Sequence, residues 1–504
     1  MLDATLYIFT FKLWVGGGDS VLKKEIPVKL TFGLIFAGCL LSTAALAQLP
    51  VNLTIETNPP ESSISPGFIG FSFETGSLRY GRDRKDGYFF DSSNTQLITL
   101  FRNLGVRSLR IGGNSVEEYT PSTKDIDALF RFAKAAGVKV IYSLPLAKGG
   151  PDQDASIAKY LWEHYRDDLI SIAIGNEPDE YKVNGQNPAI RDYSSYLAAW
   201  KKLASAVIGA VPDVRLDGPD TDGWSAIPWT SAFAQAEQDR ANASSILYHF
   251  KPLGGAGGKT TEQLAFGELS PDLDGSIYPA GYYSIGAMAQ SYGFSYRFTE
   301  FNDWVAPRQA TIYDYSFASG LFALDALHWW AAHECRSVHF HVGIHGFHAA
   351  FFVDPAGNYQ LYPLSYGIAA FNLGGHGKVD SLKIDNPDDM NLTAYAVTDA
   401  KNNLFVTIIN KEHGAGARDA SLRINAIGKK EGVMYLKAPN HDVTETSGIT
   451  LGGTSIDGSA RWQANWSPLD SKDQTGSVVN VGASSAAIVE FSGPRITTAR
   501  KQNR

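Results

Sequence analysis

Two glutamates, Glu177 and Glu300, follow short apolar stretches that are typical of buried β-strands. The first lies in an Asn-Glu-Pro motif and the second in a Thr-Glu-Phe-Asn motif. Two carboxyl groups facing one cleft can cleave a glycosidic bond, because one protonates the leaving oxygen while the other attacks the anomeric carbon. A single glutamate after a strand is usually an ordinary surface residue. Two glutamates that both stand at the ends of predicted strands and between apolar segments instead indicate a shared catalytic site.

The segments that must position these glutamates alternate between β-rich runs and amphipathic helical stretches. The expected strands are 68–73, 108–111, 139–143, 170–174, 214–217, 246–249, 295–298 and 337–340. The expected helices are 95–103, 124–136, 155–165, 193–211, 227–238, 282–291 and 311–332, with one more after Pro363. Such alternation is typical of βαβ units and predicts an α/β fold, a closed (β/α)8 TIM barrel. An open doubly wound sheet is the alternative, but no glycine-rich phosphate loop follows the first strand, which argues against a nucleotide cofactor.

Strand ends decide where chemistry can occur in such a barrel. Active sites lie at the carboxyl ends of the strands, and strands four and seven lie across the mouth from each other. Glu177 and Glu300 can therefore face one another despite their wide separation in the sequence.

The chain changes character after about residue 377. Short strand-like runs separated by Gly, Asn and Asp predict a C-terminal antiparallel β-sandwich, and the strand 51–56 is expected to join it. We therefore expect a catalytic barrel at 65–376, a discontinuous sandwich formed by 48–64 and 377–494, and a loose tail at 495–504.

The first 47 residues have the pattern of a cleavable signal peptide. A basic segment containing Lys29 precedes an apolar segment and an Ala-Leu-Ala site, which predicts a mature start at Gln48 and a secreted or periplasmic protein. The apolar segment is too short to favour a membrane span. Lipid attachment at Cys39 is the alternative, and translation starting near Val21 is a further hypothesis. After cleavage only Cys335 remains, so we expect a buried thiol and no internal disulfide.

The charge balance excludes several kinds of partner. The chain has 44 basic and 52 acidic residues, a net charge of −8, which argues against a general nucleic-acid or anionic-membrane binder. Aromatic residues make up 12% of the chain, which is consistent with binding of sugar rings. The oligomeric state cannot be derived from these features.

A group of histidines near the eighth strand raises the question of a metal site. His339 and His341 alternate along the strand, and His345 and His348 follow it. Two imidazoles on one strand face can bind zinc. No acidic residue is placed to support such ligands, so we expect no metal, and one histidine lining the site instead.

Several ordered motifs resemble glycoside hydrolase family 79, the β-glucuronidase and heparanase relatives within clan A of the retaining glycosidases. The two glutamate motifs are joined by four further stretches: 68–74 (FIGFSFE), 109–115 (LRIGGNS), 338–341 (VHFH) and 451–455 (LGGTS). The resemblance spans nearly the whole mature chain and implies metal-free, cofactor-free hydrolysis of a carbohydrate substrate.

The resemblance implies a role for each glutamate. Glu177 would be the general acid/base, with a raised pKa, and Glu300 the nucleophile, while Asn176 would hydrogen-bond the sugar 2-hydroxyl. Other candidate substrate-binding residues are Glu74, Asn114, Tyr248, Trp304 and His341. For Tyr248 the alternative is a barrel-filling ring, and for Glu74 it is a structural pairing with Arg110.

The substrate is less clearly implied than the reaction. Glucuronidases of this family are expected to hold the sugar carboxylate with tyrosines, but no tyrosine occurs in 301–305, and Phe347 stands in the loop after strand eight. Asp303 would also repel a carboxylate. We expect a β-glucuronidase-like enzyme, with a neutral β-glycoside or heparanase-like endo action as alternatives. A non-catalytic carbohydrate-binding protein is a remote alternative.

Overall fold

The structure is a computed structural model. It describes residues 49–497, apart from 57–61, 223–225, 251–279, 304–315, 345–349, 428–429, 457–460, 470–471, 474–475 and 493–495. The predicted signal peptide, Cys39, Trp304, His345 and His348 lie outside the described residues, as does nearly all of the predicted tail.

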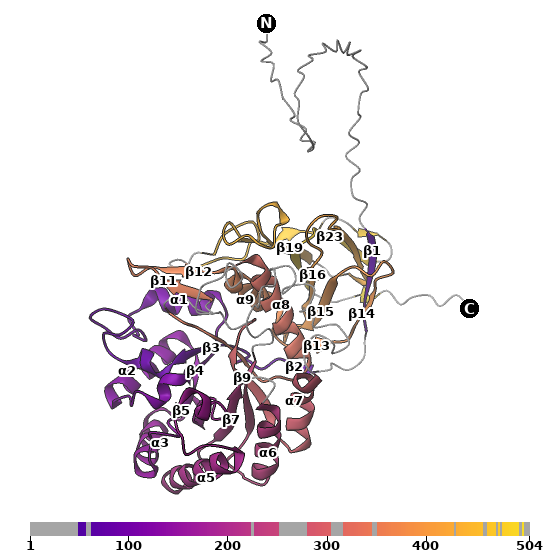
Figure 1. Cartoon of the computed structure of the whole chain (residues 1–504). Coiled ribbons are helices and arrows are strands. Elements are labelled where there is room, and N and C mark those ends of the chain that lie inside the picture. The colour runs from indigo at the N-terminus through magenta and orange to yellow at the C-terminus, as the bar shows by residue number, and fades with distance from the viewer. Residues whose placement is uncertain are drawn as a thin grey trace, which may run out of the picture. The chain divides into compact units, whose positions relative to one another are not determined.

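Eight parallel strands close into a barrel, which confirms the predicted (β/α)8 fold (Figure 1). The strands are β3 (Ile69–Glu74), β4 (Ser108–Gly112), β5 (Lys139–Leu144), β6 (Leu169–Ile174), β7 (Leu216–Asp222), β8 (Ser245–Phe250), β9 (Ser295–Phe301) and β10 (Val338–His341). The circle is completed by pairing of β10 with both β3 and β9. Nearly all of these strand residues are buried, as expected for parallel strands covered on both faces.

Helices follow the strands around the barrel. They are α1 (Thr95–Asn103), α2 (Thr123–Ala136), α3 (Pro151–Tyr165), α4 (Tyr181–Asn184), α5 (Tyr193–Ala210), α6 (Ile227–Glu237), α7 (Ala280–Ser291), α8 (Phe317–Ala332) and α9 (Pro363–Gly374). Local sequence fixes their ends. In α2, for example, Ser122 and Asp125 form a capping box, and Gly137 ends the helix at φ +75°.

Two packed sheets form the second part of the fold. One sheet has the strand order β14-β1-β17-β23-β22 and the other β2-β13-β15-β16-β24-β19-β20. Their bounds are β1 (Leu49–Ile55), β2 (Ser62–Ser63), β13 (Lys378–Asp380), β14 (Leu382–Asp385), β15 (Leu392–Thr398), β16 (Leu404–Asn410), β17 (Ala420–Ile424), β19 (Lys430–Lys437), β20 (Thr450–Leu451), β22 (Lys472–Asp473), β23 (Gly476–Val481) and β24 (Ser485–Ser492). Short pairs outside these sheets are β11 (Phe351–Val353) with β12 (Tyr359–Leu361), and β18 (Ala426–Ile427) with β25 (Ile496–Thr497), while β21 (Ser467–Pro468) pairs with β19.

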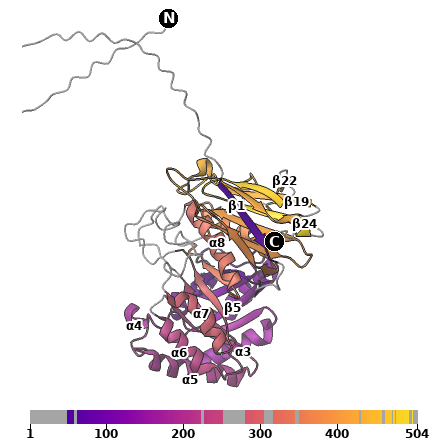
Figure 2. The same ribbon diagram turned by 90° about the vertical axis from the view of Figure 1, so that its right-hand side faces the viewer.

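One strand pair departs from the expected antiparallel arrangement. The indigo strand β1 lies among late, orange and yellow strands in Figure 2, and it runs antiparallel to β14 but parallel to β17. A hairpin forces neighbouring strands to be antiparallel. Since β1 enters from before the barrel, no hairpin constrains its direction relative to β17.

Helix α8 joins the two parts of the fold. It is buried along almost its whole length, which explains why its sequence is apolar on every side. Its Asp325 accepts hydrogen bonds from Thr393 and Tyr395 of β15 and forms a 2.8 Å ion pair with Lys411. In the described part of the chain, no helix is both long enough and apolar enough to span a membrane.

Candidate active site

Glu177 sits on a sharp turn directly after β6. Gly175 has φ +91°, and a Cβ there would lie 3.1 Å from Leu146, so this close turn favours glycine. Glu177 itself has φ +46°, and its amide donates to the backbone oxygen of Asp220 at 2.8 Å. A positive φ costs a non-glycine residue about 1–3 kcal/mol and is often retained at functional sites. This backbone places the Glu177 carboxyl at the barrel mouth.

Glu300 lies near the end of β9 and is buried, with only 5% of its surface exposed. Its Oε1 accepts a 2.7 Å hydrogen bond from Nη1 of Arg110, a fully buried residue of β4. The Nη2 atom of Arg110 donates to Oδ1 of Asn176 at 2.6 Å and to Oδ2 of Asp220 at 2.5 Å. Arg110 therefore links Glu300 to the residue that precedes Glu177.

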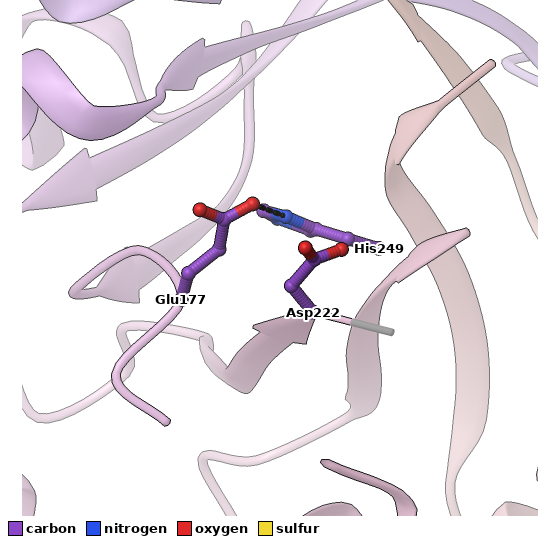
Figure 3. Close-up of side chains that lie close together, drawn as sticks. All are labelled: Glu177, Asp222 and His249. Carbon is purple, nitrogen blue, oxygen red and sulfur yellow. Dashed lines mark hydrogen bonds and ion pairs between the residues drawn. The ribbon is translucent and has the colours of Figure 1, made fainter. Parts of the chain in front are cut away.

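His249, at the end of β8, lies between the two glutamates. Its Nδ1 is 2.9 Å from Oε1 of Glu177 and 3.7 Å from Oε2 of Glu300. The two oxygens therefore lie no farther apart than these two distances together, at most about 6.6 Å. Figure 3 shows the Glu177 carboxyl directed at the His249 ring. The structure thus brings the two predicted glutamates to one place.

Asp220 of β7 is a site residue that the sequence did not reveal. It is fully buried, and its Oδ1 lies 3.3 Å from Nε2 of His249 and accepts a short hydrogen bond from Thr299. Burial alone would raise the pKa of Asp220, but the charges of Arg110 and His249 outweigh it and hold that pKa well below its usual range. Asp220 is therefore a buried anion that holds both cations.

The same charges act on the two cations. Burial opposes protonation of His249, but Glu300 and Asp220 outweigh it and raise the pKa of His249 to about 10. Burial likewise opposes the charge of Arg110, yet Asp220 and Glu300 hold its pKa above the ordinary value. At neutral pH the site therefore contains two cations, with Glu300 and Asp220 directly beside them.

The loop that carries Glu177 is supported from behind by a second buried carboxylate. Glu117 accepts hydrogen bonds from the amides of Leu146, Ala147 and Lys148 and from the hydroxyl of Tyr181 at 2.6 Å. That hydroxyl in turn accepts from the amide of Asn176 at 3.2 Å. This support holds the Asn176-Glu177 backbone in one position.

Three other predicted residues lie around the glutamates. His341 has its Nδ1 3.6 Å from Oε1 of Glu300 and its Nε2 4.0 Å from Oε1 of Glu74. The carboxylate of Glu74 accepts from the amide and hydroxyl of Ser115 and from the amide of Asn114, rather than from Arg110. The side chain of Asn114 accepts from Nδ2 of Asn176 at 3.4 Å.

Tyr248, a candidate substrate-binding residue, lies in β8 next to His249. Its fully buried ring packs edge-on against Phe298, 6.4 Å between centroids, in the barrel core. The pairing of β8 with β9 shifts register between Tyr248 and His249, so alternation along the strand does not give the facing residue. His249 occupies the position beside the glutamates, and the sequence signal for it was its place at the strand end.

Glu177, Asp222 and His249 form a group that could be compared with a metal centre (Figure 3). Each offers one ligand atom, and these atoms lie within 4.8 Å of one another. A protonated imidazole has no lone pair for a metal, and the pKa of His249 is raised to about 10 by Glu300 and Asp220 against the effect of burial. We therefore interpret His249 as a hydrogen-bond donor to Glu177, and the absence of a metal stays a prediction.

The raised pKa of His249 predicts a specific pH dependence of stability. The folded pKa lies above the unfolded value of about 6.5, so the stabilisation is fully present below pH 6.5 and is lost as the pH rises towards 10. We expect the free-energy difference between wild type and His249→Gln, measured by urea unfolding, to shrink from pH 7 to pH 10. His328→Gln is the matched control, because burial lowers the pKa of His328 to about 3 and it stays neutral in this range. Equal pH slopes for the two variants would contradict the assignment.

Comparisons with known proteins agree on the fold. No protein-family model matches the chain, and no curated protein sequence matches it either. Among solved structures it is similar to a 4-O-α-L-rhamnosyl-β-D-glucuronidase from Fusarium oxysporum, with TM-score 0.67 and 16% identity over 87% of this chain and 100% of that one. An α-L-arabinofuranosidase from Thermotoga maritima has TM-score 0.65 and 15% identity, over 88% and 99% of the two chains. A GH39 β-xylosidase from Caulobacter crescentus has TM-score 0.56 and 15% identity, over 88% and 100%.

Proposed function

We propose that this protein is a glycoside hydrolase that cleaves β-glycosides with retention of configuration. The observation that carries the proposal is that carboxylate oxygens of Glu177 and Glu300 lie 2.9 and 3.7 Å from the same atom, Nδ1 of His249. These two oxygens are therefore at most about 6.6 Å apart. Retaining enzymes hold their carboxyl groups about 5–5.5 Å apart, and inverting enzymes about 6.5–9.5 Å. The limit of about 6.6 Å permits the shorter range, in which the second carboxylate itself attacks the sugar, and the resemblance of the two glutamate motifs to those of retaining glycosidases supports it.

The proposed reaction has two steps. In the first, Glu300 attacks the anomeric carbon while Glu177 gives its proton to the departing oxygen, which forms a glycosyl ester on Glu300 and releases the alcohol. In the second, Glu177 takes a proton from water, and the resulting hydroxide displaces Glu300 from the sugar. Two inversions at one carbon give net retention.

Charge balance explains how one glutamate can start as an acid and the other as a base. The charges of Arg110 and protonated His249 equal those of Asp220 and Glu300. Since these four charges cancel, they do not offset a charge on Glu177, which favours a proton on Glu177 against the opposing hydrogen bond from His249. Arg110 also holds Glu300 in its ionised, attacking form, because its Nη1 donates to Oε1 at 2.7 Å.

We infer a β-glucuronide as the preferred substrate. The sequence resemblance supports this choice, as does the structural likeness to a glucuronidase. Asp303 is buried, and its Oδ2 is engaged within the protein, because it accepts a 2.6 Å hydrogen bond from Ser319 of α8. The lack of a tyrosine in 301–305 still favours a neutral β-glycoside as the second candidate.

A panel of aryl glycosides tests both the reaction and the substrate. We expect the β-glucuronide to be cleaved faster than the β-glucoside, the β-xyloside or the α-L-arabinofuranoside. Proton NMR of early product should show the β-anomer first, because two displacements retain configuration. Faster cleavage of the glucoside would assign a neutral β-glycoside, and not a β-glucuronide, as the substrate. An α-anomer as first product would overturn the double displacement. Binding of sugar without turnover of any substrate would favour the non-catalytic alternative.

A further inference from the structure

The amino-terminal ends of the barrel strands, on the face opposite the two glutamates, carry a concentration of positive charge. Two hollows lie there, of about 310 and 340 Å³. The first is lined by three arginines and Trp462, and the second by three further cations, Trp162 and a single acid, Asp167. We call the six cations the basic track: Arg102, Arg107, Arg461, Lys139, Arg166 and Arg215.

The two hollows adjoin each other across the β4–β5 ladder. Arg107 directly precedes β4 and belongs to the first hollow, whereas Lys139 begins β5 and belongs to the second. The amide of Lys139 donates to the carbonyl of Arg107 at 3.0 Å. Arg215, just before β7, has its carbonyl bonded to the amide of Ile172 in β6, which extends the same rim. The cations therefore follow one edge of the sheet.

The charges of the basic track are free to meet an external partner. All six side chains belong to exposed residues, and among the described residues no ion pair joins any of them to a carboxylate. Arg102 donates one hydrogen bond to the carbonyl of Ala135, which leaves most of its donors unused. Six cations gathered on a chain of net charge −8 form a local positive region, which attracts anions.

The neighbouring side chains indicate what kind of anion fits. Trp162 and Trp462 are each half-buried, so each indole presents part of its surface beside the cations. Asn372, which is partly exposed, adds an uncharged polar group suited to a hydroxyl. Guanidinium groups bind planar carboxylates in a bidentate manner. A polymer of acidic sugars offers rings, hydroxyls and regularly spaced carboxylates together.

We propose that the basic track is a secondary binding site for an acidic polysaccharide, separate from the catalytic face. The site would hold the enzyme on polyuronate-containing material while the barrel mouth acts on its substrate. The choice of a polysaccharide as ligand rests on the proposed glycosidase function, whereas the surface itself follows from the positions of the charges.

The test uses the full mature chain and polygalacturonate, an α-linked polyuronate that a β-glycosidase does not cleave. We expect binding by titration calorimetry at low salt that weakens steeply as salt is added. The double variant Arg107→Gln/Lys139→Gln should bind about 25-fold more weakly, or roughly fivefold per lost cation. Its kcat and KM on a small aryl glycoside should not change, because both residues lie on the opposite face.

The matched control is Lys383→Gln/Lys401→Gln, which removes two exposed cations from the sandwich. It should bind polygalacturonate like the wild type, and an equal loss in both double variants would show that only net charge matters and would overturn the site. No binding by the wild type would overturn it as well, whatever the result with aryl glycosides. Tighter binding of a single-stranded oligonucleotide than of polygalacturonate would assign the surface to nucleic acid instead. Unchanged thermal unfolding of both variants would confirm that they are folded.

Discussion

Glu300→Gln is expected to lower kcat on an aryl glycoside by about 10⁴-fold or more, since loss of an attacking group in a hydrolase costs on this order. Glutamine has the size of glutamate and still offers an oxygen to Nη1 of Arg110, 2.7 Å away in the wild type. The fold should therefore survive while the nucleophile is lost. Steady-state kinetics together with thermal unfolding would separate these two effects.

Glu177→Gln should also have a lower kcat than the wild type, but the decrease should depend on the leaving group, because Glu177 is the proposed general acid. Loss of a general acid lowers kcat by about 10²–10⁴-fold, and the decrease should be smaller for a leaving group that needs no proton, such as dinitrophenolate.

Added azide distinguishes the two roles by the configuration of its product. It should give the β-glycosyl azide with Glu177→Ala, where azide replaces water in the second step. It should give the α-glycosyl azide with Glu300→Ala, where azide replaces the nucleophile.

The control for both variants is Glu163→Gln on the exposed side of α3, which should leave kcat unchanged. If Glu300→Gln retained wild-type turnover, the two-step scheme would be wrong. If the azide products were exchanged between the two alanine variants, the roles of Glu177 and Glu300 would have to be exchanged too.

The barrel was predictable because its signals are local. Most of its strands contain a short apolar run between polar segments, and parallel strands buried on both faces need such runs. The two glutamates could be placed because they follow such runs directly. Their common location then follows from closure of the sheet, which brings the carboxyl ends of all eight strands to one face.

Asp220 was not predictable from the same signals. It lies in β7, which extends to Asp222, five residues beyond the expected end of that strand. Gly218 and Pro219 precede it, and Gly-Pro followed by aspartate is typical of a turn. The barrel holds this segment in a sheet because its neighbours β6 and β8 impose the pairing, so tertiary contacts override the local preference.

The partners of Arg110 show a second limit. Its contacts with Asn176, Asp220 and Glu300 span 66, 110 and 190 residues of sequence. A sequence of one protein contains no signal for which carboxylate meets which cation over such separations. The alternative interpretation of Glu74 as a structural partner of Arg110 does not hold, because Arg110 pairs with Asp220 and Glu300 instead.

Arg110→Met is expected to lower the free energy of unfolding by about 3–5 kcal/mol, because it removes the closer of the two cations shared by the buried carboxylates of Asp220 and Glu300 and leaves them the longer contacts with His249. Activity should fall as well, since Glu300 loses the donor that orients it. Urea unfolding at pH 7 measures the first effect. Arg297→Met is the control, because Arg297 donates to the hydroxyl of Ser337 and has no carboxylate partner among the described residues, so we expect a smaller loss of about 1–3 kcal/mol.

A double variant decides whether the loss comes from charge or from packing. Asp220→Asn in the Arg110→Met background removes one of the two carboxylates, so it should cost less than Asp220→Asn alone, or even restore stability. We expect a coupling energy of about 0.5–3 kcal/mol between the two positions, as found for residues in one ion-pair network. If the two losses simply added, Arg110 would stabilise the barrel through its volume alone. The proposed balance of two cations against two anions around Glu177 would then lack its physical basis.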